Sequence, residues 1–357
     1  MLHQYEQTRK QIFGRFCSFN SLREIRSIPT TGDSEMPLKV KTAKIIMRLL
    51  PSRPIFDITH PRSETINHKD FINANEQDKN RILLQMANGH YMGEKRKPFD
   101  LFFPGYSLRN LLKGKKVLDL GCWCGGETVA FAERWAVASI DGIDVNEYFI
   151  RAAILFSSNR PNKNIDYRFN VGFGEALPYE DATFDAIVSH DVFEHVRSPR
   201  RTIIECKRVL KPGGILFCVF PSYYFPFEGA HFNFVTRMPC IQWLFDPVTL
   251  NTAYDEIIKS RGEEAYWYKP KEIARNNWEK LHGGIGINGV TFSDYKSMAR
   301  EAGFSEVHIL PTPLLSVSDL SIQHPIVKYI SKILKPLLRI ESLQEYLSHR
   351  IVSMLVA

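Results

Sequence analysis

Two carboxylates and a glycine-rich turn are spaced so that a strand-and-helix fold would bring them together. Asp119 lies in a short apolar run, two residues before Gly121, and Gly125 closes the turn that follows. Asp144 lies at the end of the next apolar run. The carboxyl ends of neighbouring parallel strands meet at one edge of a sheet, where ligands of such folds bind. The spacing therefore predicts a nucleotide-like ligand at this edge.

The acid at position 119 restricts the chemistry of that ligand. A dinucleotide places its pyrophosphate at the helix N-terminus after such a turn, and a carboxylate there would repel it. A ligand with a sulfonium and an ammonium group would instead be attracted by this carboxylate. Asp119 could also cap the loop by accepting hydrogen bonds from backbone N–H groups. The Asp144 carboxylate can accept hydrogen bonds from both hydroxyls of an unphosphorylated ribose. Asp141 is the competing acid for that role.

At these residues the sequence resembles the class I S-adenosylmethionine-dependent methyltransferases, and most closely their type 11 branch. The resemblance covers about residues 115–220 and, weakly, the final strands. It rests on five blocks that occur in the order of the family, namely 117–125, 142–144, 175–178, 184–187 and 209–214. A single block of this kind is weak evidence for the family, but five blocks in the same order are strong evidence.

The resemblance implies a Rossmann-like α/β fold, S-adenosylmethionine as cofactor and methyl transfer as the activity. It also implies a set of cofactor-binding residues, which are Asp119, Gly121, Trp123, Gly125, Asp144, Gly174, Glu175 and Ser189.

Two positions depart from the family pattern. Trp123 replaces the middle glycine of the loop, so an indole either covers the methionine part of the cofactor or packs against the N-terminal region. Phe173 stands where the family often has an acid or amide beside the adenine. We therefore expect apolar contact and the backbone near Gly174 and Glu175 to hold the adenine.

Strands alternate with helices from residue 116 onward, which predicts a mostly parallel sheet with helices on both faces. The last strand is expected to be antiparallel and to complete a seven-stranded sheet. Ser198-Pro199 predicts the start of one helix, and Thr291 with Asp294 resembles a capping box for another. The predicted strands cover residues 117–120, 140–145, 166–173, 184–189, 215–220, 306–310 and 350–357.

The chain divides into four regions on this pattern. Residues 1–114 form an N-terminal extension of helices and loops without an interpretable motif, and 115–220 form the cofactor-binding core. Residues 221–290 form an aromatic-rich insertion that is expected to bind substrate or act as a lid. Residues 291–357 return to the core and include an amphipathic helical insert. Its basic stripe, near the bend expected at Pro336, comprises Lys328, Lys332, Lys335 and Arg339.

Two histidines are candidate bases for removing a hydroxyl proton during methyl transfer. His190 ends the fourth predicted strand, beside the expected methyl group, and His231 lies in the insertion. Either could instead be a structural histidine.

Asp191, Glu194 and His195 form a candidate metal site. If the chain turns helically after the fourth strand, these positions share one face, and His231 could complete the set. The arrangement resembles the acid-x-x-Glu-His site of the small-RNA 3′-end 2′-O-methyltransferases and of the ubiquinone-pathway O-methyltransferases. There a divalent metal holds the acceptor hydroxyls and lowers their pKa. Metal-free members of the family also carry Glu-His-Val at this point, with a structural histidine.

The acceptor is expected to be an oxygen of a small molecule, a glycan or a lipid-linked sugar. The Asn/Asp-Pro-Pro-aromatic signature of amino-group methylation is absent, since residues 189–192 read Ser-His-Asp-Val. An RNA 2′-O-methyltransferase and a catalytically silent binding domain are the alternatives. Nucleic acid is a less favoured partner because no aromatic-plus-basic single-strand module is recognisable. Intact Gly121, Gly125 and Asp144 argue against a silent domain.

Composition is that of an ordinary enzyme. The 357 residues carry a net charge of +7 and include six cysteines without a CxxC pair, which favours a reduced, cytoplasmic setting. There is no apolar run of membrane-spanning length and no apolar N-terminal signal. Peripheral contact with an anionic membrane through the C-terminal basic helix remains an open alternative.

Overall fold

The computed structural model describes residues 37–51, 74–160, 164–226, 232, 235–260, 288–311, 333 and 335–357. The chain divides into two units, residues 1–36 and 37–357, and the second contains every element described below.

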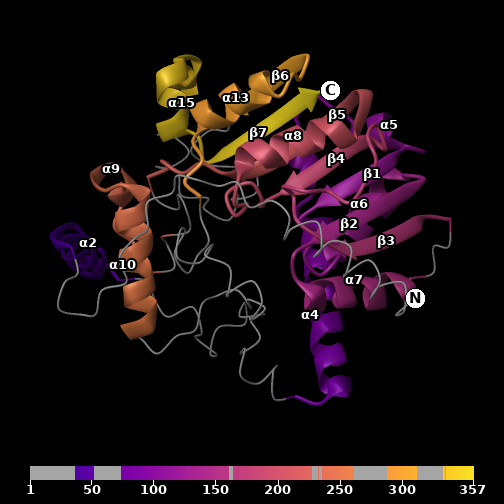
Figure 1. The fold of residues 1–357 in the computed structure, drawn as a ribbon, viewed down its shortest axis with the longest axis horizontal. Helices are drawn as coiled ribbons and strands as arrows, with labels where there is room; N and C mark the ends of the chain where they lie inside the picture. Colours follow the sequence, from indigo (N-terminus) through magenta and orange to yellow (C-terminus); the bar gives the residue numbers. More distant parts are fainter. Residues whose placement is uncertain are drawn as a thin grey trace, which may run out of the picture. The chain divides into compact units, whose positions relative to one another are not determined.

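This unit contains a seven-stranded sheet (Figure 1). Its order is β3-β2-β1-β4-β5-β7-β6, and β7 runs antiparallel to both neighbours while the pairs from β3 to β5 are parallel. The predicted α/β fold with an antiparallel last strand is therefore confirmed. The strands are β1 (Lys116–Leu120), β2 (Ser139–Asp144), β3 (Asp166–Val171), β4 (Phe184–His190), β5 (Leu210–Pro221), β6 (Glu306–Pro311) and β7 (Arg350–Val356).

Side chains alternate between two apolar layers along the strands. On one face, Leu118 and Ile187 pack with Tyr295 of α13 (Phe292–Glu301) and with α8 (Pro199–Val209). On the other face, Val117 and Val188 pack with α6 (Gly126–Trp135) and α5 (Leu108–Leu112). Because both faces are covered at the centre of the sheet, β1, β4, β5 and β7 are buried along most of their length.

The capping residues that the sequence predicts lie at the starts of α8 and α13. The Ser198 hydroxyl accepts a hydrogen bond from the backbone of Arg201 at the start of α8. Thr291 and Asp294 form a reciprocal capping box at the start of α13. Each cap supplies partners for N–H groups that the first helical turn leaves unpaired.

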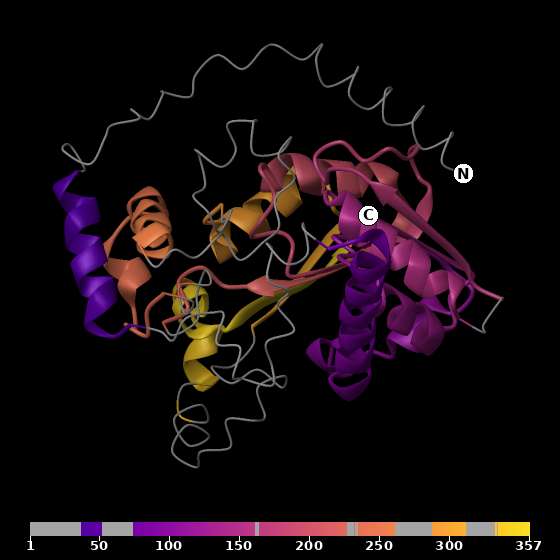
Figure 2. The same cartoon turned by 90° about the horizontal axis from the view of Figure 1, so that it is seen from below.

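Two helices of the N-terminal region pack on different parts of the described unit. Helix α4 (Glu76–Arg96) packs on α6 and on α7 (Glu147–Ser158) through an apolar cluster that includes Leu83, Ala87 and Phe156. Helix α2 (Leu38–Leu49) lies beside α10 (Pro247–Ser260), which follows α9 (Ile241–Leu244), as Figures 1 and 2 show. Hence the region without a recognisable motif packs against both the core and the insertion.

The C-terminal insert is described only in its last part. It forms a 3-10 turn, η5 (Lys335–Arg339), that contains Pro336, followed by α15 (Glu341–Leu347). Lys328 and Lys332 of the predicted basic stripe lie outside the described residues, so membrane contact through this helix stays a prediction. Among the described helices, none has the length and apolar content needed to cross a bilayer.

Candidate active site

The glycine-rich loop between β1 and α6 depends on residues without a side chain. Gly121 and Gly125 have φ angles of +78° and +75°, in the left-handed region that glycine adopts at low cost. A β-carbon at Gly121 would overlap the Val192 side chain, and one at Gly125 would overlap the side chain of Ala153. The two glycines therefore let the loop pack closely against Val192 after β4 and against Ala153.

Asp119 lies beneath this loop. Its side chain is buried, and its carboxylate accepts a hydrogen bond of 2.5 Å from the Thr128 hydroxyl on α6. Burial raises the pKa of Asp119 to about 7, against the opposing effect of that hydrogen bond. A bound cation would stabilise its ionised form.

Asp144 holds the loop from the end of β2. Its two carboxylate oxygens accept hydrogen bonds from the backbone N–H groups of Trp123 at 3.1 Å and Asn146 at 2.9 Å. Burial raises its pKa to about 6, which these hydrogen bonds oppose. Asp141 lies three residues earlier in the same strand, 4.0 Å from Arg168. The carboxylate at the sheet edge is thus that of Asp144.

Trp123, a residue of the loop, packs against two neighbouring helices. Its ring centroid lies 3.9 Å from that of Phe149 on α7 and 6.1 Å from that of His90 on α4. Trp123 thus contacts α7 of the core and lies near α4 of the N-terminal region, while cover of the methionine part of the cofactor stays a prediction.

The remaining predicted cofactor residues lie farther along the edge. The Glu175 carboxylate accepts hydrogen bonds from the backbones of Arg197 and Ser198, at 2.6 and 3.1 Å, so its side chain fixes the approach to α8. Gly174 lies close to Thr202 of that helix. Ser189 is fully buried in β4, paired in register with Cys218. Glu175 and Ser189 therefore have structural contacts besides any contact with a cofactor.

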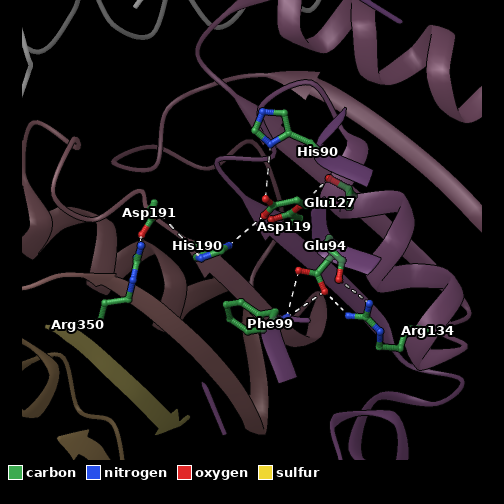
Figure 3. Close-up of polar contacts among 10 residues, drawn as sticks. His90, Glu94, Phe99, Asp119, Glu127, Arg134, His190, Asp191 and Arg350 are labelled. Carbon is green, nitrogen blue, oxygen red and sulfur yellow. Dashed lines mark hydrogen bonds and ion pairs between the residues drawn. The ribbon is translucent and has the colours of Figure 1, made fainter. Parts of the chain in front are cut away.

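His190, at the end of β4, lies between two carboxylates (Figure 3). Its Nδ1 is 3.0 Å from Glu127 Oε2, and its Nε2 is 3.9 Å from Asp191 Oδ2. Burial opposes the charged ring, but Asp191 and Glu127 together outweigh it and raise the pKa of His190 to about 9. Despite its own burial, Glu127 has a lowered pKa because of His190 and His90. At neutral pH the free protein therefore holds an imidazolium at this position.

Aromatic rings enclose this histidine on one side. Phe99 and Phe102, in the short turn η2 (Phe99–Phe102), meet the His190 ring edge-on at centroid distances of 5.3 and 5.7 Å. Arg350 of β7 pairs with Asp191 and lies 5.7 Å from the Phe102 ring. Phe99, Phe102 and Arg350 thus form a wall beside His190 that combines aromatic surface with charge.

A buried ion pair positions that aromatic turn. Glu94, near the end of α4, pairs with Arg134 of α6, and its carboxylate accepts a hydrogen bond of 3.0 Å from the Phe99 backbone. Burial raises the pKa of Glu94 to about 7, while Phe99 and Arg134 oppose that shift. Sequence reasoning missed the residues of this wall because they come from a region without a motif and from the last strand.

Three of the four candidate metal ligands, Asp191, Glu194 and His195, lie within the described residues. Asp191 has a φ angle of +54° and pairs with Arg350, so the segment does not begin a helix at this residue. Glu194 is buried, and its Oε1 lies 3.6 Å from His195 Nε2. Within the described ranges, no three acidic, histidine or cysteine side chains form a group that could hold a metal. His231 lies outside the described residues, so its part in a metal site, or as a base, stays a prediction.

The donor set at this edge fits S-adenosylmethionine. The Asp144 carboxylate, at the end of β2, can accept hydrogen bonds from ribose hydroxyls. Asp119 and Glu127 provide negative charge for the sulfonium and ammonium groups. A pyrophosphate would meet these same carboxylates and be repelled.

Comparison with known proteins places the chain in a family. The family model described as a methyltransferase domain of type 11 matches residues 118–218. A ubiquinone biosynthesis O-methyltransferase of Coxiella burnetii is 32% identical over 54% of this chain and 73% of its own length. The enzyme of that name from Idiomarina loihiensis is 29% identical over 52% of this chain and 68% of its own length. The chain belongs to the class I S-adenosylmethionine-dependent methyltransferases, in their type 11 branch, and is a methyltransferase.

Among solved structures, a Haloferax volcanii methyltransferase in complex with its activator is similar to this chain. The identity is 16% with a TM-score of 0.43, over 77% of this chain and 97% of that one.

Proposed function

We propose that this methyltransferase transfers its methyl group to an oxygen atom of a small molecule, a glycan or a lipid-linked sugar. The names of the two relatives support an oxygen acceptor. So does the segment Ser189 to Val192, which lacks the residues typical of amino-group methylation.

The observation that carries the proposal is the setting of His190. It lies at the carboxyl end of β4, next to the Asp191 carboxylate and against the rings of Phe99 and Phe102. An acceptor hydroxyl at this point would meet an aromatic surface and two titratable groups. Methyl transfer to a hydroxyl needs both alignment and a group that takes the proton.

S-adenosylmethionine supplies an electrophilic methyl group bonded to a positively charged sulfur. The acceptor oxygen forms the new bond to that carbon, the carbon–sulfur bond breaks with its electron pair going to sulfur, and the hydroxyl proton must leave. A cation beside His190 disfavours its imidazolium form. We therefore expect His190 to be a proton donor in the free protein and the base when the cofactor is present.

Transfer of a carbon-13 methyl label tests the acceptor class. The full chain is incubated with methyl-labelled S-adenosylmethionine and fractionated cell extract, and the labelled product is identified by its carbon-13 chemical shift. We expect an O-methyl signal in the small-molecule, glycan or lipid fraction, and a weaker signal with Asp144→Ala. Label found on nitrogen, or in RNA, would contradict the proposal.

A further inference from the structure

His90 brings the N-terminal helix α4 directly to the glycine-rich loop. A β-carbon on Gly126, the first residue of α6, would lie 2.9 Å from His90 Cβ and 2.8 Å from the Tyr91 backbone nitrogen. The His90 ring lies near Trp123, and its Nδ1 is 3.6 Å from Glu127 Oε1 (Figure 3). The family model begins at residue 118, so the matched segment does not include this helix.

The charges around the loop leave one end of the cofactor without a matching group. The amino-acid end of S-adenosylmethionine carries a carboxylate as well as an ammonium group. Asp119 and Glu127 suit the positive groups of the cofactor and Asp144 suits its ribose hydroxyls, but all three carboxylates repel the carboxylate of the cofactor. That carboxylate therefore needs an N–H donor within reach of the loop.

His190 and Arg350 are poorly placed to supply this donor, because each is already engaged by a carboxylate. His190 Nδ1 contacts Glu127, and Arg350 pairs with Asp191. His90 differs from both, since its side chain is 39% exposed. In the part of the chain that the structure describes, its Nε2 has no hydrogen-bond partner.

We propose that His90 donates a hydrogen bond to the carboxylate of bound S-adenosylmethionine, which makes α4 a part of the cofactor site. The proposal rests on the cofactor of the family and does not depend on the acceptor. The competing explanation is that His90 only ties α4 to Glu127 and so supports the fold. The two differ in whether the effect of His90 depends on the carboxylate of the ligand.

Calorimetry with two ligands separates these explanations. Decarboxylated S-adenosylmethionine keeps the sulfonium and the amine but lacks the carboxylate. His90→Ala should bind S-adenosylmethionine about tenfold more weakly, the effect of one hydrogen bond to a charged group, and bind the decarboxylated ligand like the wild type. His90→Gln, which retains a side-chain N–H, should recover part of the loss.

Tyr91→Phe is the matched control on the same helix. It removes a hydrogen bond of 2.7 Å to Glu133, away from the loop, and should change neither affinity. Equal losses for both ligands in His90→Ala, or unchanged affinity for S-adenosylmethionine, would overturn the proposal. A wild-type chain that binds S-adenosylmethionine and shows the expected ligand dependence, yet methylates no oxygen acceptor, would refute the proposed function alone.

Discussion

Glu127→Gln should lower the pKa of His190. The Glu127 carboxylate lies 3.0 Å from His190 Nδ1 and, with Asp191, raises that pKa from 6.5 to about 9 against the effect of burial. An opposite charge at hydrogen-bond distance typically shifts a pKa by about 1–3 units. At 1.36 kcal/mol per unit, its removal costs the imidazolium about 1.4–4 kcal/mol. We expect the pKa of His190 in Glu127→Gln to be about 1–3 units lower than in the wild type.

Imidazole NMR over a pH titration measures this value directly. The His190 signal is assigned by its loss in His190→Gln. Glu133→Gln is a matched control on the same helix, because Glu133 binds Tyr91 and not His190. A wild-type His190 that titrates near 6.5, or one whose pKa is the same in Glu127→Gln, would refute the assignment of an imidazolium.

The same shift has a consequence for stability. Since the folded-state pKa lies above the unfolded value of 6.5, protonated His190 stabilises the fold fully below pH 6.5. That contribution is lost as the pH rises through about 9. Urea unfolding should therefore show the wild type losing stability relative to His190→Gln between these two pH values. A difference that grows with pH would contradict the sign.

Three other perturbations test the loop and the sheet. Asp144→Ala should weaken S-adenosylmethionine binding by about 1.5–3 kcal/mol in calorimetry, while Asp141→Asn leaves it unchanged; the reverse result would move the ribose role to Asp141. Gly126→Ala should destabilise the protein by about 1–3 kcal/mol in urea unfolding, because the new methyl overlaps the α4 backbone. Gly93→Ala, with open space around it in α4, should not destabilise it. Deletion of residues 350–357 removes β7 from between β5 and β6, so a truncated chain that melts like the full one would contradict the sheet order.

The parallel part of the fold was predictable because its determinants are local. Apolar runs, turn residues and caps such as Ser198 occur next to the elements that they begin or end. The antiparallel last strand was also predicted, but its place between β5 and β6 was not. That place depends on pairing partners that are forty or more residues away along the chain, which no local pattern encodes.

The residues of the site also fall into a predictable group and a group that only the fold brings together. The types and strand positions of Asp119, Asp144 and His190 follow from the motif, so sequence could identify them. The charge on His190 could not be predicted, because it depends on Glu127 from α6 and on Asp191 in a left-handed conformation. His90 and Phe99 were missed for a related reason, since their contacts with the site arise only from the packing of α4.

The segment after β4 connects the cofactor loop to the insertion. Val192 fills the space beside Gly121, so this segment contacts the loop directly. At the end of the insertion, Asn288 donates from its side chain to the carbonyls of Phe193 and Val196, at 2.6 and 2.8 Å. Its backbone N–H donates to the carbonyl of Glu194 at 2.8 Å. If the insertion binds the acceptor, as the sequence predicts, a displacement of Asn288 would also displace the segment that borders His190. The end of the insertion and the cofactor loop are thus linked through one hydrogen-bonded segment.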